Sequence, residues 1–357
     1  MNPSFSALST ATLLLPRRPR RTFSRLPWCL LAPFRAHPVP FAKLAAPGLL
    51  LLVQSAALAI GPAGQTIAPQ YDNVVRVLVL DTSLPDGEGF FNGTGSVVAN
   101  QNVGGQGMLW VLTADHVIST GGPTGAARSG IGFAFGNSPD AGGAATGNSA
   151  YYNNSYAQVG SIFRGGSTGV EDLALYGVDY GAYNAALTTV SLVPATAFFN
   201  FSDIGYGNQG NLVAGGYQAQ GKYGTQRYFN QKVGTFKLTY TTADGYTMET
   251  AEFQIQNPTD ASAPAGSGAA LDADSGSPWF SSANNGTYYK NNEFAVLSGI
   301  KGGPTNGLFA FGQTEYAVSL SQQDVNWVYA SVPEPGPALA LLGLVSTWFA
   351  LRSRRAA

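Results

Sequence analysis

Short apolar runs separated by turn-forming residues are the feature that most constrains the fold of this chain. Between residues 72 and 331 these runs are bounded by clusters of Gly, Asn, Asp and Pro, and the 357-residue chain contains 45 glycines. No amphipathic pattern of useful length predicts a helix there, whereas such runs predict β-strands joined by turns. Many short strands in one chain indicate an antiparallel barrel or a sandwich. We expect strands at Asn73–Leu80, Gly95–Ala99, Met108–Thr113, Asp172–Val178, Asn211–Tyr217, Gly234–Tyr240, Phe253–Gln256 and Phe294–Ile300, and long loops over Gly121–Ser155.

Charge is distributed unevenly along the chain. Ten of the 19 Lys and Arg residues lie in the first 43 residues or among the last six, and the last three of these are Arg352, Arg354 and Arg355. Residues 60–331 hold the other nine basic residues against nineteen acidic ones, a net charge of −10. A body this acidic disfavours nucleic acid as a partner.

The few cysteine and histidine residues of the chain limit the metal and redox chemistry that it can carry out. The only cysteine is Cys29, so the body has neither a disulfide framework nor a thiolate metal site. One histidine and scattered acids in the body offer no cluster of metal ligands, and we expect no metal enzyme and no cofactor. A calcium site built from loop Asp and Asn residues stays open, without assignable residues.

The N-terminal segment, residues 1–59, carries an export signal. Residues 44–59 read LAAPGLLLLVQSAALA, with Lys43 before the apolar run and small residues at Ala57 and Ala59. This arrangement predicts a secretory signal peptide that signal peptidase cuts after Ala59. A buried core helix is the alternative. The preceding segment is long for a signal peptide, so we expect translation to start near Val39.

The C-terminal segment, residues 332–357, reads VPEPGPALALLGLVSTWFALRSRRAA. Its Pro-Glu-Pro motif, apolar stretch (336–351) and arginine tail resemble the PEP-CTERM sorting signals of Gram-negative bacteria. The resemblance implies a transient membrane anchor through a hydrophobic helix at 336–351, processing by an exosortase, and a place at the cell surface or in the extracellular matrix. A plain membrane anchor is the alternative, and both interpretations place the body outside the cytoplasm.

One serine is placed like a nucleophile. Ser275 lies in DADSGSPW (272–279), between an acid and a glycine. A serine hydroxyl needs a base to take its proton, and histidine is the usual base because its pKa lies near neutrality. His37 precedes the expected cleavage site, which leaves His116, in VLTADHV (111–117), as the candidate. Asp172, in EDLAL at the head of an apolar run, is placed to orient the imidazole.

Together these motifs resemble the trypsin-like serine proteases. LTADHV is similar to the histidine motif of that family, EDLAL to its aspartate motif and DSGSP to its serine motif, and the order His–Asp–Ser is the same. GTGSVVA and LVAGGY are similar to strands of its two barrels. The resemblance covers roughly 73–330. It implies two antiparallel β-barrels of the chymotrypsin type, at 60–195 with His116 and Asp172 and at 196–331 with Ser275, and an active site in the cleft between them.

Roles for individual residues follow from the resemblance. Ser275 would be the nucleophile, His116 the general base and then acid, and Asp172 the orienting carboxylate. The backbone N–H groups of Ser275 and Ala273 would form the oxyanion hole. The family usually has glycine where this chain has Ala273, and alanine has more restricted backbone dihedrals.

The resemblance also implies substrate contacts. Ser298 and Gly299 would belong to the edge strand that pairs with the substrate backbone. Ala269 stands where trypsins carry an acid, which argues against cleavage after Lys or Arg. Asp274 matches the acid that, in zymogen-type members, pairs with a newly freed N-terminus, here Ile60. A local hydrogen bond of Asp274 is the alternative that we favour.

Two hypotheses of function therefore remain. The first is an exported serine endopeptidase that acts on protein or peptide substrates. The second is a binding or matrix module at the cell surface that keeps the protease fold with little or no catalysis. The complete set of three motifs favours the first, and Ala273 leaves room for the second.

Overall fold

The computed structural model describes residues 73–81, 89–128, 130–134, 161–195, 200–206, 210–219, 226–264, 266–282 and 288–333. The chain divides into two units, Met1–Gln54 and Ser55–Ala357, and all described residues belong to the second. The expected signal peptide lies outside the described residues, as does the expected sorting segment except for Val332 and Pro333. Within the described ranges, no helix is both long and apolar enough to span a bilayer.

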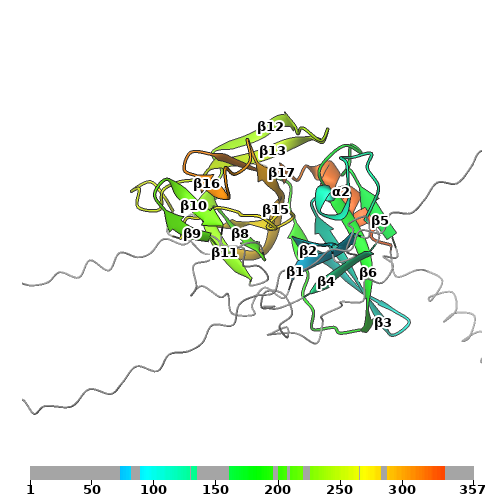
Figure 1. The fold of residues 1–357 in the computed structure, drawn as a ribbon. Helices are drawn as coiled ribbons and strands as arrows, with labels where there is room; N and C mark the ends of the chain where they lie inside the picture. The colour runs from blue at the N-terminus through cyan, green and yellow to red at the C-terminus, as the bar shows by residue number, and fades with distance from the viewer. Residues whose placement is uncertain are drawn as a thin grey trace, which may run out of the picture. The chain divides into compact units, whose positions relative to one another are not determined.

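The first half of the described chain forms a six-stranded antiparallel sheet with the order β4-β1-β2-β3-β6-β5 (Figure 1). Neighbouring strands in the sequence mostly pair with each other, as short turns favour. The strands are β1 (Val74–Asp81), β2 (Gly89–Val103), β3 (Gln106–Thr113), β4 (Gly130–Ala134), β5 (Ser161–Arg164) and β6 (Ala174–Ala182).

The second half forms an eight-stranded sheet. Seven of its strands have the order β11-β8-β14-β15-β17-β13-β12, and the eighth, β7, pairs in parallel with β15. A three-stranded sheet has the order β16-β10-β9. The strands are β7 (Ser191–Leu192), β8 (Asn200–Gly205), β9 (Gly210–Val213), β10 (Gly216–Ala219), β11 (Arg227–Lys232), β12 (Thr235–Thr241), β13 (Thr247–Gln254), β14 (Pro278–Ser282), β15 (Tyr288–Ile300), β16 (Leu308–Ala310) and β17 (Thr314–Ser319).

The predicted all-β class is confirmed. The only helices among the described residues are a single turn, α1 (Asp115–Ile118), and α2 (Gln322–Ser331). With the exception of the β7–β15 pair, the strand pairs are antiparallel. In the described part of the chain, β4 and β5 are the unpaired edges of the six-stranded sheet.

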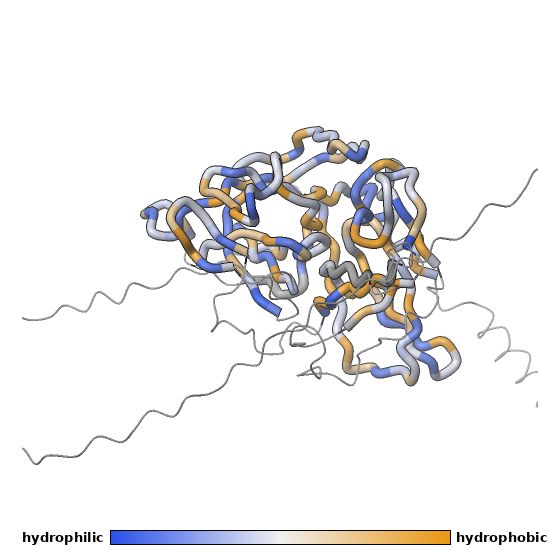
Figure 2. Tube along the Cα trace, viewed as in Figure 1, coloured by the Kyte–Doolittle hydropathy of each residue, from blue (hydrophilic) through white to orange (hydrophobic). Residues whose placement is uncertain are grey.

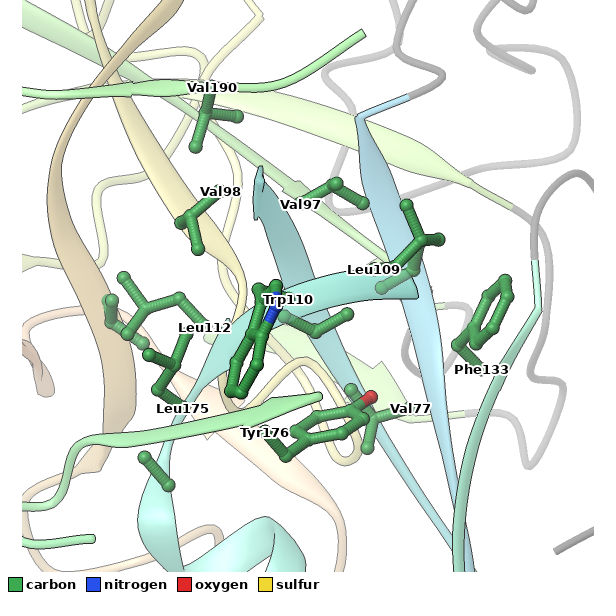
Figure 3. Packing of buried hydrophobic residues seen from close by; sticks show 14 of the residues in the cluster. Val77, Val97, Val98, Leu109, Trp110, Leu112, Phe133, Leu175, Tyr176 and Val190 are labelled. Atoms are coloured by element: carbon green, nitrogen blue, oxygen red, sulfur yellow. The ribbon is translucent and has the colours of Figure 1, made fainter. Parts of the chain in front are cut away.

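Apolar side chains from the strands form two large cores. Trp110 and Tyr176 lie at the centre of the first, surrounded by aliphatic residues from β1, β2 and β3 (Figure 3). Hydrophobic and hydrophilic stretches alternate along the trace, as Figure 2 shows. The first core also includes Phe280 and Val296 from the second half of the chain, so the two sheets share buried surface. The second core is aromatic, with Phe201 stacked on Trp279 at a centroid distance of 4.1 Å.

Three local predictions are wrong. The expected strand Asn211–Tyr217 is a hairpin of β9 and β10, because Gly215 has a φ of 91° and the chain reverses there. The prediction of long loops over Gly121–Ser155 is wrong at β4, whose Ile131 and Phe133 are buried against β1, while residues 135–155 lie outside the described residues. Helix α2 was not expected from the sequence. Its Ser321 and Asp324 form a capping box, which favours the start of a helix at this point. The helix has no strong apolar periodicity, which is the pattern by which a helix is predicted from the sequence.

Candidate active site

His116 lies on the one-turn helix α1, directly after β3. The strand is an inner one, and its residues Val111 and Leu112 are fully buried. Val117 and Ile118 anchor the turn in the core, while the imidazole of His116 keeps 30% of its side-chain surface exposed. The apolar strand therefore fixes the backbone, and the turn presents the ring to solvent.

Asp172 binds His116 at two points. Its Oδ2 lies 2.7 Å from Nδ1 of the ring, and its Oδ1 accepts the backbone N–H of His116 at 2.9 Å. A carboxylate that accepts a hydrogen bond from Nδ1 favours the tautomer with the proton on Nδ1, which leaves the lone pair on Nε2. The pair thus holds the ring in one orientation with its basic nitrogen free to accept a proton.

The two groups change each other's pKa. Burial alone would lower the pKa of His116, but the negative charge of Asp172 and its hydrogen bond raise it above the ordinary value. Burial alone would raise the pKa of Asp172, whereas the charge of His116 and its hydrogen bonds lower it below the ordinary value. The ion pair of imidazolium and carboxylate is therefore favoured when the ring takes up a proton.

Ser298 supplies another hydrogen bond to Asp172. Its hydroxyl donates to Oδ2 of Asp172 at 2.5 Å. The register between β15 and β17 shifts between Leu297 and Gly299, so a β-bulge turns Ser298 out of the ladder. The sequence predicted Ser298 as a contact of its backbone with the substrate, and its side chain has the additional role of supporting the carboxylate.

The loop that carries Ser275 packs against β2 and against the end of β3, the strand that precedes His116. The carbonyl of Ser275 accepts the N–H of Thr94 on β2 at 2.9 Å. Gly276 has a φ of 86°, and a Cβ there would lie 2.1 Å from Oγ1 of Thr113, at the end of β3. Only glycine fits this close approach. Ser275 is thereby held beside the last residues of β3, and its side chain is partly exposed.

Gly93 on β2 makes a second such contact. A Cβ there would lie 2.4 Å from a methyl group of Val117 and 3.2 Å from the carbonyl of Ser275. Val117, the neighbour of His116, and the backbone of Ser275 therefore both lie against Gly93 of β2. The structure therefore brings the turn of His116 and the loop of Ser275 together, although no hydrogen bond joins the hydroxyl of Ser275 to His116 in the described contacts.

A tight turn precedes Ser275. The N–H of Asp274 donates to the carbonyl of Leu271 at 3.0 Å, and the Asp274 carboxylate accepts the N–H of Leu271 at 2.9 Å. The favoured local hydrogen bond of Asp274 is confirmed, whereas Ile60 lies outside the described residues. Ala273, the third residue of the turn, has a φ of 68°, a value that a type II turn requires and that favours glycine.

A charged network beside His116 was not predicted. Asp115 is fully buried and accepts two hydrogen bonds from Arg164, through Nε at 2.5 Å and Nη2 at 2.6 Å. The hydroxyl of Tyr246 donates to Asp115 at 2.7 Å. Arg164 is 49 residues from Asp115 and Tyr246 is 131 residues away, so no local pattern in the sequence relates them.

Two hollows flank the site. One is lined by His116, Asp172 and Ser298 together with Thr242, Asp244 and Tyr246 of the β12–β13 hairpin. The other is lined by Ser275 and Gly299, among other residues. Ala269 is fully buried in the second core and does not reach this hollow, so the structure does not place it as a substrate contact. Among the described residues, no group of three or more potential ligands is arranged to hold a metal ion.

Comparison with known proteins gives little further information. No family model matches the sequence, and no curated protein matches it. Among solved structures, the chain is similar to a crystal structure of the inactive form of Rv3671c from M. tuberculosis H37Rv, a serine-to-alanine mutant. The identity is 13%, the match covers 81% of this chain and 96% of that one, and the TM-score is 0.35. With so low a TM-score, this likeness carries no weight for the function of the chain.

Proposed function

We propose that this protein is a serine endopeptidase in which Ser275, His116 and Asp172 form a catalytic triad. The observation that carries the proposal is the doubly bonded pair of His116 and Asp172, with the Ser275 loop packed against the end of β3, the strand that precedes His116. A buried carboxylate that fixes the tautomer of a partly exposed imidazole is the arrangement that activates a serine hydroxyl.

The reaction follows from these positions. The oxygen of Ser275 attacks the carbonyl carbon of the peptide bond while Nε2 of His116 takes the hydroxyl proton, and Asp172 stabilises the imidazolium. The N–H groups of Ala273 and Ser275 would bind the oxyanion. When the C–N bond breaks, His116 returns the proton to the leaving amine and leaves an acyl-enzyme. Water then attacks the ester carbonyl with His116 again as base. The C–O bond to Ser275 breaks, His116 returns the proton to the oxygen of Ser275, and the carboxylic acid product leaves.

The backbone of residues 298–300 is placed to hold a peptide. β17 pairs with this stretch of β15 on one side, through Gly299 and Ile300. β14 pairs with β15 only up to Val296, so in the described chain no strand covers the other edge of 298–300. A substrate in extended conformation can add to such an edge by main-chain hydrogen bonds. Ser298 and Gly299 thus keep their role as proposed contacts with the substrate backbone.

The fold, domains and location belong to the same proposal. We infer that the two large sheets are the two β-barrels of a trypsin-like protease, at 60–195 and 196–331. We also infer export after removal of residues 1–59 and sorting through 332–357 by an exosortase. Mass spectrometry of the terminal peptides of the mature protein tests the removal of residues 1–59 and the processing of residues 332–357. Mature chains that retain residues 2–30 contradict the N-terminal part, and intact chains that end at Ala357 contradict the C-terminal part.

A second function, a binding module without catalysis, is favoured by two observations. Ala273 strains the turn that would form the oxyanion hole, and the hydroxyl of Ser275 makes no hydrogen bond to His116. Hydrogen bonds of catalytic groups often tighten only when substrate binds, so the second observation does not decide against catalysis. A labelling experiment separates the two functions.

The experiment is reaction of the purified full chain with a fluorophosphonate, which labels activated serines. We expect one labelled serine, Ser275, and loss of labelling and of peptide turnover in Ser275→Ala. The matched control is Ser262→Ala, at an exposed loop serine, which should label like the wild type. Absence of labelling in the wild type, with peptide turnover unchanged in Ser275→Ala, would support the binding module instead.

A further inference from the structure

The hollow beside Ser275 contains a buried acid that the reaction does not use. This hollow, which we call the Glu315 pocket, has about 380 Å³ of empty space, part of it open to solvent. Its walls are apolar, and two carboxyl groups, Glu315 and Asp272, line it. The apolar residues are Ala270, Leu271, Leu297, Ile300, Pro304 and Phe309.

Strand pairing turns the side chain of Glu315 toward this pocket. Glu315 is paired with Ile300 across the β15–β17 ladder, and the next residue, Tyr316, lines the other hollow together with His116. Successive side chains of a strand point to opposite faces, so β17 separates the two hollows and contributes one residue to each.

The carboxyl group of Glu315 has one oxygen without a partner. Its Oε2 accepts the N–H of Ala270 at 3.0 Å, whereas Oε1 is buried and has no hydrogen bond. Glu315 is 1% exposed. A buried oxygen without a partner is unfavourable, and a donor that enters the pocket would remove this cost.

The surroundings favour a positively charged donor. None of the described residues that line the pocket is basic, and Asp272 is exposed at the same pocket. Burial raises the pKa of Glu315 well above its usual range, opposed by the Ala270 N–H and reinforced by the charges of Asp203 and Asp274. A cation brought into this group of acids would stabilise the ionised carboxylate.

We propose that the Glu315 pocket binds the side chain of a lysine or arginine whose carbonyl Ser275 attacks, and that Glu315 is the residue that selects it. The proposal rests on the proposed peptidase function, because Ser275 both lines the pocket and carries out the attack. The aliphatic stem of the basic residue would lie along the apolar walls while its charged end meets Oε1. An acidic substrate residue would be repelled, and an aliphatic one would leave Oε1 unpaired.

This inference reverses the expectation drawn from Ala269. That expectation placed the selecting position six residues before the serine and found no acid there. The structure buries Ala269 in the core and brings an acid from β17, 40 residues after the serine in the sequence, to the pocket instead.

The test compares cleavage of matched peptides by the purified full chain. The peptides differ only at the residue before the cleaved bond, which is lysine or norleucine in one pair and arginine or citrulline in the other. Each uncharged member keeps the stem of the side chain and lacks its charge: norleucine lacks the terminal nitrogen of lysine, and citrulline has a neutral urea group in place of the guanidinium. We expect kcat/KM to be at least about tenfold higher for the charged member of each pair.

Two variants assign the preference to Glu315. Glu315→Gln keeps an oxygen for the Ala270 N–H and removes the charge, so the ratio within each pair should fall to about one. Glu249→Gln, at an exposed position on β13, is the matched control and should keep the wild-type ratio. The wild-type peptide ratios do not depend on the folding of either variant.

The outcomes separate the two proposals. If a fluorophosphonate labels Ser275 while norleucine and citrulline peptides are cleaved as fast as their charged partners, the pocket proposal is wrong and the peptidase stands. The same holds if Glu315→Gln folds and keeps the preference. If Ser275 is not labelled and no peptide is cleaved, the peptidase proposal fails, and the pocket proposal fails with it.

Discussion

Arg164 and Asp115 form a two-point ion pair directly beside the histidine of the site. Two nitrogens of the guanidinium donate to the two oxygens of the carboxylate, at 2.5 and 2.6 Å. Asp115 is fully buried, and the side chain of Arg164 is 18% exposed. The same guanidinium donates to the carbonyls of Gly122 and Gly125, so it also fixes the loop after α1. The pair connects β5 to the turn that presents His116.

The first prediction concerns this ion pair. Arg164→Leu leaves the buried carboxylate of Asp115 without its cation, and we expect the free energy of unfolding to fall by about 3 kcal/mol. Chemical denaturation measures the change. The double variant Asp115→Asn/Arg164→Leu removes the stranded charge and should recover part of the loss. Lys232→Leu, at an exposed site on β11, is the control and should change stability little. An Arg164→Leu variant as stable as this control would contradict the structural role.

The second prediction concerns the orientation and the pKa of His116. In Asp172→Asn, the amide can donate to Nδ1 and favour the wrong tautomer, so we expect kcat/KM to fall by about 10³- to 10⁴-fold. The folded protein should also lose the effect that raises the pKa of His116. The acid limb of the pH profile, which reports the loss of neutral imidazole as pH falls, should therefore move to lower pH.

Ser298→Ala provides a graded comparison for the same carboxylate. It removes one of the hydrogen bonds to Asp172 and leaves the bonds from His116 in place. We expect a smaller loss of kcat/KM, about tenfold. An Asp172→Asn enzyme with wild-type activity and an unshifted acid limb would exclude Asp172 from the catalytic machinery.

The third prediction concerns the turn before Ser275. Ala273→Gly replaces a residue strained at a φ of 68° by one that adopts this conformation freely. We expect stability to rise by up to about 1 kcal/mol, since the relief of strain exceeds the added flexibility of the unfolded chain. The oxyanion turn should also be more fully populated, which raises kcat.

The control for this turn is Ala182→Gly. Ala182 is an exposed residue at the end of β6 and is not among the residues with positive φ. Glycine there should lower stability by about 0.5–1 kcal/mol. If thermal unfolding shows the same loss of stability for Ala273→Gly as for Ala182→Gly, the positive φ of Ala273 does not strain the folded protein.

The fourth prediction concerns the pH dependence of stability. Burial, followed by the hydrogen bond and charge of Asp324, raises the pKa of Glu171 to about 8 from its ordinary value of 4.5. Between these values the folded state binds more protons than the unfolded state, so stability falls as pH rises, by up to about 1.4 kcal/mol for each pH unit. The stabilisation is fully present on the acidic side and is lost once pH passes about 8.

Glu171→Gln tests this linkage. The variant removes one titrating group, so its stability should depend less on pH than that of the wild type when denaturation is measured from pH 5 to pH 9. Part of the slope should persist, because burial also raises the pKa of Glu293 to about 8. The double variant with Glu293→Gln should be flatter still. An unchanged slope in Glu171→Gln would mean that the side chain ionises normally in the folded protein.

Much of the architecture could be predicted from the sequence because strand signals are local. Alternating or continuous apolar runs bounded by Gly and Asn indicate strands wherever they occur, and the runs at Asn73–Leu80 and Met108–Thr113 match β1 and β3 closely. Errors arose where one residue reverses the chain, as at Gly215, or where a cap starts a helix, as at Ser321. These features depend on backbone geometry that composition does not express.

For the candidate site, the sequence by itself determined which groups are available. It contains one histidine in the body, an acid before an apolar strand and a serine between an acid and a glycine. Their chemistry depends on residue type and immediate neighbours, so it can be recognised in a linear pattern. The pairing of His116 with Asp172, across 56 residues, agrees with that expectation in the folded chain.

Only the tertiary structure decided which distant residues surround those groups. Arg164 and Tyr246 on Asp115, Ser298 on Asp172, and Glu315 in the pocket beside Ser275 come from other strands, and Glu315 replaces Ala269 as the residue that lines the pocket. The physical reason is that strand register sets which side chains share a face and a neighbour. A shift of one residue would turn Glu315 away from the pocket and Tyr316 into it. Register arises from pairing across the whole sheet, which no local stretch of sequence specifies.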